Sequence, residues 1–195
     1  MSIPAAAAPE PAAASEPAAA PEPAAAPEPA AADRRRLGEL ANGYVVSRAV
    51  RTDVPAVVGM LQDDDLRRGH EVDASDPRYC AAFDRIDADP NQVLAVLVDP
   101  AGVVVGSMQL TLIAGLSRAG ATRALIEAVR ISAAHRGGGL GSAFLIWAIN
   151  YSRQRGASLV QLSTDQRRLD AHRFYRRLGF VGSHLGMKLE LSSSG

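Results

Sequence analysis

Residues 129–142 read VRISAAHRGGGLGS, and this stretch decides the expected fold. An apolar run ends in four glycines within five positions, and a helix-forming segment follows directly. Glycines allow the backbone to turn with several amide groups facing one concavity, and the first turn of a helix adds unpaired amides and a positive dipole end. The stretch therefore predicts a strand, a loop that binds a phosphate or pyrophosphate, and a helix.

Two common nucleotide motifs fit this loop poorly. A P-loop needs a lysine directly after its last glycine, whereas Gly141-Ser142 is followed by Ala143. A dinucleotide fingerprint that starts at Gly137 needs a sixth-position glycine, and Ser142 stands there. A different phosphate ligand, or a glycine-rich turn without a ligand, remains open on this segment alone.

Strand and helix patterns alternate on both sides of the glycines. Apolar, β-branched runs predict strands at residues 44–50, 93–98, 103–113, 124–131, 158–163 and 180–191. Three-to-four spacing of apolar residues predicts helices at about 53–61, 77–86, 140–155 and 167–178, with Thr52 capping the first and Gly179 ending the last. The turn DPAG at 99–102 makes two strands an antiparallel hairpin. The sequence thus predicts one α+β domain over residues 44–195, a mostly antiparallel twisted sheet flanked by helices.

The N-terminal part has a different composition. Residues 10–33 form four hexamers of the type EPAAAP, and eight of the twelve prolines lie before residue 30. Frequent prolines interrupt each alanine run before it can nucleate a helix. Residues 1–36 are therefore expected to be a disordered Ala/Pro/Glu-rich tail, with the arginines at 34–36 as a solvated hinge.

Charge and cysteine content exclude several classes of protein. The 21 bases balance 21 acids, but the four glutamates of residues 1–32 leave the remainder with four more bases than acids. This moderate surplus suits a polyanionic small molecule better than a nucleic-acid duplex. The single Cys80 excludes an internal disulfide framework, and no histidine spacing suggests a metal site. Without a membrane span or signal peptide, the expected location is cytoplasmic.

A second motif, AHRFYRRLGF at residues 171–180, completes a recognisable pattern. The chain resembles the GCN5-related N-acetyltransferases (GNAT) over roughly residues 44–191. The features that carry the resemblance are the strand IEAVRIS, the motif Arg136-x-x-Gly139-x-Gly141 after it, and then an amphipathic helix, a strand and AHRFYRRLGF. The resemblance implies the acyltransferase fold of that family and acetyl-CoA as the acyl donor.

The resemblance also implies site residues. The pantetheine arm would pair with the strand and the pyrophosphate would lie on the loop, through Val129, Arg130, Ile131, Arg136, Gly137, Gly138, Gly139, Leu140, Gly141 and Ser142. Tyr175 would protonate the departing thiolate, although a tyrosine here can also serve only core packing. Arg168 stands where many members carry asparagine, and this departure weakens the transfer of a CoA contact to that position.

Glu127 is the candidate general base, because attack on a thioester requires a neutral amine. It is the only acid in residues 119–163 and lies two positions before Val129. Strand alternation predicts that residues 127, 129 and 131 share a face. The alternative is a surface glutamate, or an ion pair with Arg123 or Arg130.

These residues predict an enzyme that transfers acetyl directly to a primary amine of a small molecule. Cys80 lies too far from the motifs to suggest an acyl-enzyme. A protein N-terminus or lysine as acceptor, and a non-catalytic acyl-CoA-binding module, are the alternatives, while an arginine-rich nucleic-acid binder ranks last. The oligomeric state stays open, with a homodimer as one candidate.

Overall fold

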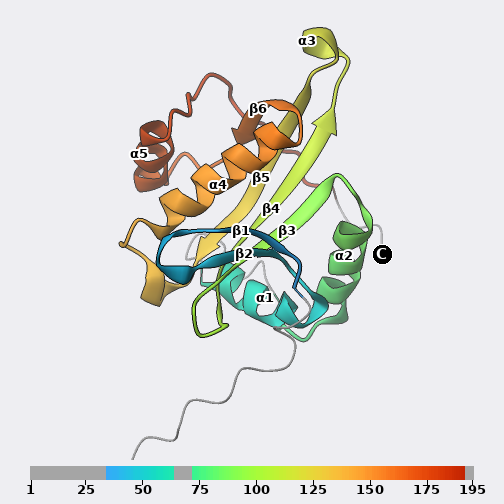
Figure 1. The fold of residues 1–195 in the computed structure, drawn as a ribbon. Coiled ribbons are helices and arrows are strands. Elements are labelled where there is room, and N and C mark those ends of the chain that lie inside the picture. Colours follow the sequence, from blue (N-terminus) through green and yellow to red (C-terminus); the bar gives the residue numbers. More distant parts are fainter. Residues whose placement is uncertain (1–33, 64–71, 192–195) are drawn as a thin grey trace, which may run out of the picture.

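The computed structural model describes residues 34–63 and 72–191. Its centre is a six-stranded sheet in the order β1-β2-β3-β4-β5-β6 (Figure 1). The strands are β1 (Arg36–Glu39), β2 (Val45–Arg48), β3 (Gln92–Val98), β4 (Val104–Ala114), β5 (Thr122–Ile131) and β6 (Ala157–Leu162). All neighbours are antiparallel except β5 and β6, which are parallel. The predicted α+β class with a mostly antiparallel sheet is confirmed.

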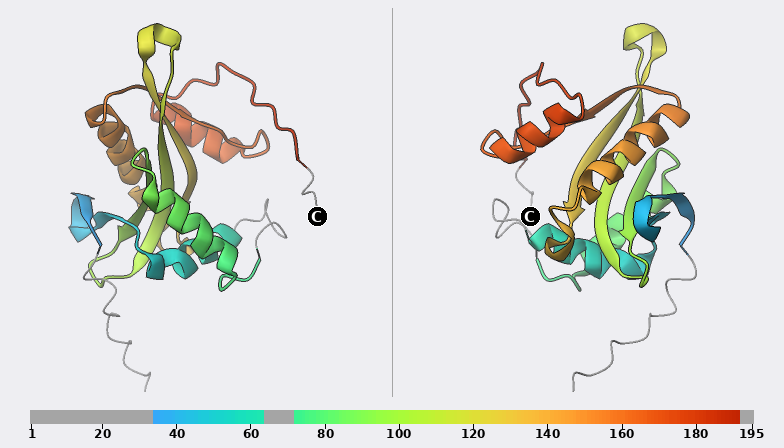
Figure 2. Two further views of the ribbon diagram at one scale, coloured as in Figure 1. Left: turned by 90° about the vertical axis from the view of Figure 1, so that its right-hand side faces the viewer. Right: turned by 60° about the vertical axis from the view of Figure 1, so that its left-hand side comes forward.

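Helices cover both faces of this sheet (Figure 2). They are α1 (Val54–Gln62), α2 (Pro77–Ala88), the single turn α3 (Ser117–Gly120), α4 (Leu140–Gln154) and α5 (Leu169–Arg177). Helices α1 and α2 share one hydrophobic core, and α4 and α5 pack on another. None of the helices in the described ranges is long and apolar enough to cross a bilayer.

Strand β3 separates the two cores because its side chains alternate between the faces of the sheet. Ala95 and Leu97 belong to the core that contains Phe144 of α4, whereas Val96 and Val98 belong to the core under α1 and α2. All four are at most 8% exposed. The central strand is therefore buried on both faces, which explains its nearly continuous apolar sequence.

The packed structure begins before Tyr44. Strand β1 pairs with β2, and the Arg34 Nε donates to the Asp53 carboxylate at 3.0 Å. Both side chains of this ion pair are buried, with 10% and 3% exposed. The expectation of a solvated hinge is therefore wrong for Arg34. The tail up to residue 33 lies outside the described residues, as do 64–71 in the polar loop that follows α1.

Asp53 also corrects the predicted helix cap. Its carboxylate accepts a hydrogen bond from the Val50 amide at 3.0 Å, ahead of the short 3-10 turn Arg51–Asp53 that leads into α1. Thr52 lies inside that turn and is not the cap. The Asp53 carboxylate is the cap in place of the Thr52 hydroxyl because it accepts hydrogen bonds from a backbone amide and from a buried guanidinium together.

The final predicted strand does not form. Helix α5 ends before Gly179, which has the expected left-handed conformation with φ of 89°, and the Phe180 amide then bonds the Tyr175 carbonyl. Residues 181–191 follow without joining the sheet, and their large apolar side chains are exposed. A strand requires a partner edge, and Figure 2 shows this segment running clear of the sheet.

Candidate active site

A β-bulge in β5 sets the geometry of the candidate site. Gln109 of β4 pairs with Glu127, but Ser107 pairs with Arg130, so that β5 contains one residue more than β4 between these pairs. Ala128 takes up the extra residue with a left-handed φ of 51°. A bulge of this kind exchanges the faces on which the following side chains lie.

The exchange overturns the predicted alternation around Glu127. Val129 and Ile131 pack into the core with α4, the same core that holds Ile126. Glu127 directly follows Ile126 and therefore lies on the opposite face, under α1 and α2, where it is exposed. Residues 127, 129 and 131 do not share a face, because the prediction assumed an uninterrupted strand.

The bulge lies in the part of β5 that, within the described ranges, pairs with β4 alone. Pairing with β6 ends at Ile126 and Leu162, while β5 continues to Ile131. Two carbonyls of this stretch accept from side chains instead: Val129 from Arg130 Nη1 at 2.8 Å and Ile131 from Arg136 Nε at 2.9 Å. The end of β5 therefore offers backbone groups that an extended ligand could pair with.

The glycine loop follows this unpaired edge directly. Gly137 and Gly139 have φ values of 88° and 80°, and Gly139 immediately precedes α4. No atom of residues 34–63 or 72–191 would contact a Cβ within 4 Å at Gly137, Gly138 or Gly139, so this part of the chain leaves the loop surface open. A 15-residue helix therefore presents its N-terminal amides at an accessible loop. The open loop and the helix N-terminus are compatible with the pyrophosphate site expected from the sequence, which stays a prediction.

Arg136 holds the loop in place. Its guanidinium donates to the Ile131 carbonyl and, at 2.6 Å, to Asp63 directly after α1. Both partners of the ion pair are about half exposed, with 51% and 55%. A pair this accessible can open at little cost, so the guanidinium is able to turn toward an anionic ligand.

The other predicted donor-binding residues lie at the end of β5 and in the first turn of α4. Leu140, Val129 and Ile131 direct their side chains into the core and can reach a ligand only through their backbone. A Cβ at Gly141 would lie 3.7 Å from Ile131 and 3.9 Å from Phe174, in ordinary contact with both. Ser142 is half-buried in the first turn of α4.

Tyr175 of α5 packs against the core on the α4 side of the sheet. Its ring contacts those of Phe174 and Phe180, with centroids 5.2 and 5.9 Å away. Burial raises the pKa of the Tyr175 hydroxyl, and the positive charges of Arg130 and Arg168 oppose part of that rise. The phenol therefore stays protonated at neutral pH, which a proton donor requires. The fold brings Arg168 close enough to act on Tyr175 electrostatically.

A polar row beside Glu127 was missed at the sequence level. Gln109, the register partner of Glu127, donates from Nε2 to Gln92 Oε1 at 2.8 Å, and Gln92 Nε2 donates to Asp89 at 3.0 Å. The bond from Gln92 is the largest cause that lowers the pKa of Asp89. An ionised carboxylate can only accept hydrogen bonds, so Asp89 fixes the orientation of the side-chain amides of Gln92 and Gln109. The Oε1 of Gln109 then lies on the side away from β3. Two glutamines within apolar strands were the available signal.

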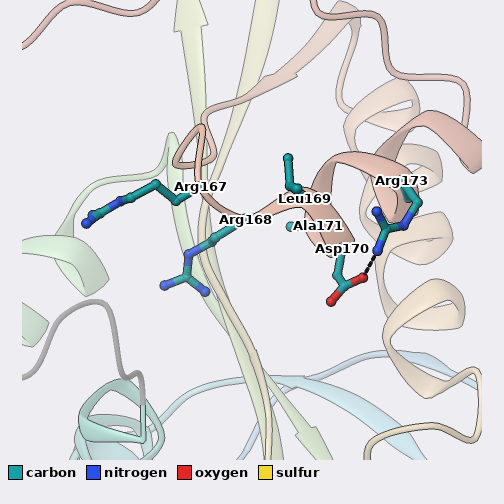
Figure 3. A pocket seen from close by; sticks show the side chains of 6 residues that line it. All are labelled: Arg167, Arg168, Leu169, Asp170, Ala171 and Arg173. Atoms are coloured by element: carbon teal, nitrogen blue, oxygen red, sulfur yellow. Dashed lines mark hydrogen bonds and ion pairs between the residues drawn. The ribbon is translucent and has the colours of Figure 1, made fainter.

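A hollow of about 610 Å³ lies at the start of α5 (Figure 3). It is lined by Arg167, Arg168, Leu169, Asp170, Ala171 and Arg173. Arg167 is paired with Asp165 at 2.8 Å, and Arg173 with Asp170. Figure 3 shows Arg167 and Arg168 extending to the same side, away from Arg173. The arginines give the hollow a positive character that suits an anionic ligand.

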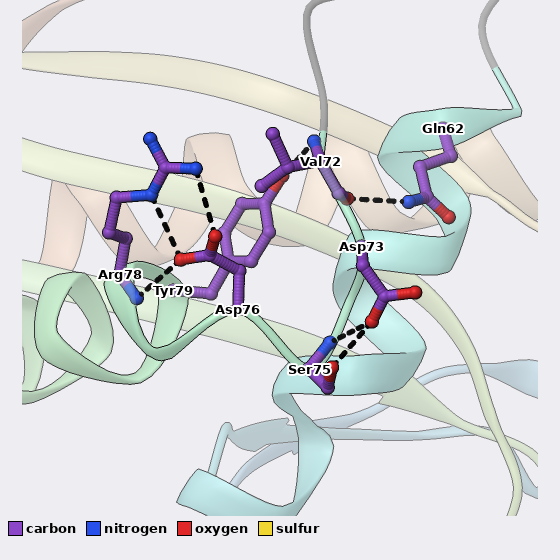
Figure 4. Close-up of polar contacts among 7 residues, drawn as sticks. All are labelled: Gln62, Val72, Asp73, Ser75, Asp76, Arg78 and Tyr79. Carbon is purple, nitrogen blue, oxygen red and sulfur yellow. Dashed lines mark hydrogen bonds and ion pairs between the residues drawn. The ribbon is translucent and has the colours of Figure 1, made fainter.

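Residues 72–76, directly before α2, make polar contacts with α1 and α2. Figure 4 shows these polar contacts: Gln62 donates to the Val72 carbonyl at 2.8 Å, and the Val72 amide donates to the Tyr79 hydroxyl at 3.1 Å. Asp76 caps α2, and its hydrogen bonds from Arg78 lower the pKa of the carboxyl to about 2. These contacts join Val72 to Gln62 of α1 and to Tyr79 of α2.

Comparison with known proteins agrees with this geometry. A model of the acetyltransferase (GNAT) family matches residues 54–180. An aminoalkylphosphonate N-acetyltransferase from Salmonella typhimurium is 53% identical over 49 residues, which are 25% of this chain and 32% of that protein. A glucosamine 6-phosphate N-acetyltransferase from Trypanosoma brucei brucei is 34% identical over 92 residues, 47% of this chain and 60% of that protein.

The chain thus spans less than two thirds of the length of these two curated relatives. The crystal structure of a transcriptional regulator from Bacillus halodurans C-125 matches with a TM-score of 0.72 and 40% identity, over 76% of this chain and 99% of that one. The family model extends from α1 to the end of the motif that contains Tyr175, and so includes the glycine loop. The chain belongs to the GNAT family of acetyltransferases.

Proposed function

We propose that this protein is an enzyme that transfers an acetyl group from acetyl-CoA directly to a primary amine of a small molecule. The observation that carries the proposal is the arrangement around the end of β5, which pairs with β4 but extends beyond its pairing with β6. Glu127 lies on one face of this strand, Tyr175 packs from the other, and the glycine loop follows at its end. A thioester lying along this edge is accessible to a base from one side and to an acid from the other.

The donor site consists of the unpaired edge and the loop. Backbone groups of Val129 and Ile131 pair with the extended pantetheine arm, which displaces the side chains of Arg130 and Arg136 from their carbonyls. The amides of residues 137–142 bind the pyrophosphate at the N-terminus of α4. The open surface above Gly137, Gly138 and Gly139 supports this assignment, since no side chain among the described residues lies within 4 Å of a Cβ built there.

Glu127 and Tyr175 carry the proton transfers. An alkylammonium ion has a pKa of ~10, so its deprotonation at pH 7 contributes about 4 kcal/mol to the barrier. Glu127 accepts this proton, and the neutral amine nitrogen forms a bond to the acetyl carbon. The nitrogen then loses a second proton to solvent as the carbon–sulfur bond breaks, which leaves a neutral amide. Tyr175 gives its hydroxyl proton to the departing thiolate. Arg130 and Arg168 stabilise the tyrosinate that results.

The acceptor is an amine that also carries a phosphate or phosphonate group. The two curated relatives are named for acceptors of this kind, an aminoalkylphosphonate and glucosamine 6-phosphate. The charge of this chain supports the same class, because residues 33–195 hold an excess of bases and 20 of the 21 bases are arginines. Arginine forks bind phosphoryl oxygens in pairs.

Direct transfer in the cytoplasm is the simplest route. Cys80 lies in α2 and packs beside the core under α1, so it is not placed as an acyl carrier at the glycine loop. A lone cysteine also suits a reducing compartment.

The test is release of free CoA thiol with matched pairs of amines. Glucosamine 6-phosphate is compared with glucosamine, 2-aminoethylphosphonate with ethanolamine, and peptides with free N-termini or lysines complete the panel. We expect kcat/KM to be at least about tenfold higher for each phosphorylated or phosphonylated amine, since one ionic contact contributes at least ~1.4 kcal/mol. Preference for peptides would favour a protein acetyltransferase instead.

Turnover must also be separated from donor binding. Acetyl-CoA at 100 times its dissociation constant should stabilise the protein by about 2.7 kcal/mol. Stabilisation without turnover of any amine would indicate a non-catalytic acyl-CoA-binding module. In the active enzyme, Glu127→Gln should reduce kcat near pH 7 and leave the acetyl-CoA dissociation constant unchanged. Equal rates in the wild type and the variant would remove Glu127 from its role.

A further inference from the structure

A groove of about 510 Å³ lies between β1 and α4, two elements that are labelled in Figure 1. Residues 37–41 form one wall, and the other wall consists of α4 side chains that include Trp147 and Tyr151. The rings of these two residues stack with their centroids 5.1 Å apart. Ile146, which is 47% exposed, lines the same groove. The groove therefore offers partly exposed aromatic and aliphatic surface.

Hydrogen-bond donors lie among these apolar groups. The indole Nε1 of Trp147 donates to no residue within the described ranges. Asn150 accepts at Oδ1 from Arg153 Nη1 at 2.7 Å, which leaves the hydrogens of its Nδ2 group to donate. The Tyr151 hydroxyl accepts from Arg155 Nη1 at 3.0 Å and can donate its own hydrogen. A ligand that is rich in carbonyl groups and poor in amide hydrogens fits such a surface.

The N-terminal tail has the sequence of such a ligand. Proline has no amide hydrogen, and each hexamer of residues 10–33 contains one or two prolines. A polyproline II helix has about three residues per turn, so a period of six residues equals two turns. In this conformation one ridge, here called the proline ridge, holds Pro11, Pro17, Pro23 and Pro29. The next ridge holds Glu10, Glu16, Glu22 and Glu28.

The length of one hexamer also matches the groove. Six residues of polyproline II helix are about 19 Å long. The part of α4 that lines the groove runs from Ala143 to Gln154 and is about 17 Å long. One hexamer therefore extends along the whole groove.

Connectivity and charge favour the tail of the same chain as the ligand. Residue 33 joins Arg34, two residues before β1, and β1 belongs to the wall of the groove. A short connection of this kind gives an effective concentration in the millimolar range. Residues 1–32 contain four glutamates and no lysine or arginine, whereas the rest of the chain has an excess of bases. Two of these bases, Arg153 and Arg155, flank the groove residue Gln154.

We propose that the N-terminal tail of this chain, residues 10–33, binds in the groove between β1 and α4 as a polyproline II helix. The proline ridge packs on the rings of Trp147 and Tyr151, and the indole Nε1 donates to a carbonyl of the tail. The glutamates lie toward Arg153 and Arg155. The inference does not depend on the proposed enzymatic activity.

The test uses the full chain, in which Trp147 is the only tryptophan and therefore reports on the groove directly. The first variant replaces the proline ridge with glycines (Pro11→Gly, Pro17→Gly, Pro23→Gly and Pro29→Gly). Its indole Nε1–H should exchange faster with solvent in NMR spectra than that of the wild type, and acrylamide should quench its fluorescence more strongly. A synthetic peptide of residues 10–33, added to this variant, should restore both properties.

The matched control also replaces four prolines, none of them on the proline ridge (Pro4→Gly, Pro9→Gly, Pro21→Gly and Pro27→Gly). It should keep the properties of the wild type, although the tail gains the same number of glycines. A change on the groove side, Ile146→Glu, should raise the dissociation constant of the peptide, measured on the first variant, at least about tenfold. Ile146 is exposed and glutamate favours helices, so this variant should fold, as checked by circular dichroism.

Three results would overturn the proposal. Equal indole exchange and quenching in the wild type and the first variant would mean that the tail does not occupy the groove. Equal loss of protection in both proline variants would exclude the proline ridge as the contact. Protection that disappears on dilution would mean that the tail of a second copy, and not that of the same chain, fills the groove.

Discussion

Gly139 offers the sharpest test of the proposed pyrophosphate loop. Its φ of 80° lies in the left-handed region, and no atom would contact an added Cβ within 4 Å. Gly139→Ala therefore causes no steric clash, and its whole cost is the backbone strain of an L-residue in this conformation, about 1–2 kcal/mol. This strain can lower either the stability of the protein or its affinity for acetyl-CoA, and separate measurements distinguish the two effects.

If the loop keeps its conformation, the strain appears as lost stability, and Tm falls by about 2–8 °C for a chain of this size. If the loop relaxes, binding must restore the strained conformation, and the acetyl-CoA dissociation constant rises about 5- to 30-fold. The sum of the two free-energy losses should equal about 1–2 kcal/mol in either case. Thermal unfolding and isothermal titration calorimetry measure the two parts.

Gly120→Ala is the matched control. Gly120 has a nearly identical φ of 78° and equally open surroundings, but it lies in the α3 turn at the far end of the sheet (Figure 1). This substitution should reduce stability and leave acetyl-CoA affinity unchanged. The assignment of the loop fails if both variants weaken acetyl-CoA equally, or if Gly139→Ala changes neither stability nor affinity.

Three further outcomes follow from the structure. Tyr175→Phe should lower kcat by roughly 10²-fold and leave acetyl-CoA affinity unchanged. Because Tyr175 acts in its protonated form and burial raises its pKa, wild-type activity should fall only at a pH above the usual tyrosine range. The pH–rate profile of the variant should lack this decrease. Gln109 is the register partner of Glu127, and its Oε1 can accept a hydrogen bond from an amine bound beside that carboxylate. Gln109→Leu should therefore raise KM for the amine with little change in the acetyl-CoA dissociation constant, and an unchanged KM would show that Gln109 does not contact the acceptor. Asp53→Asn leaves the buried Arg34 without its counter-charge and should lower the free energy of unfolding, measured with urea, by about 3 kcal/mol. Asp84→Asn, which removes a charge from an exposed ion pair, should leave the free energy of unfolding almost unchanged.

Much of the fold follows from local sequence patterns. The helix over residues 140–155, the strand before the glycines and the helix that ends at Gly179 were all predictable, because apolar spacing along one element reports which of its sides is buried. The glycine loop was equally visible, since left-handed backbone conformations favour glycine wherever they occur. These features depend only on residues close together in the chain.

The short strand β1 and the Arg34–Asp53 ion pair were not predictable. Strand β1 has four residues and becomes a strand only through its pairing with β2. Arg34 follows a proline-rich tail and resembles a solvated base until Asp53, 19 residues later, accepts its hydrogen bonds. Neither feature leaves a periodic pattern that a single segment could reveal.

The candidate site shows the same division most clearly. The sequence by itself determined the kinds of residue present: a carboxylate at Glu127, a phenol at Tyr175 and glycines between strand and helix. Only the tertiary structure decided the face on which Glu127 lies, because the bulge at Ala128 arises from the register of β5 against β4 and has no local signal. The pattern of residues 180–191 likewise predicted a strand, but pairing requires a neighbouring edge, and the position of that edge depends on the fold of the rest of the chain.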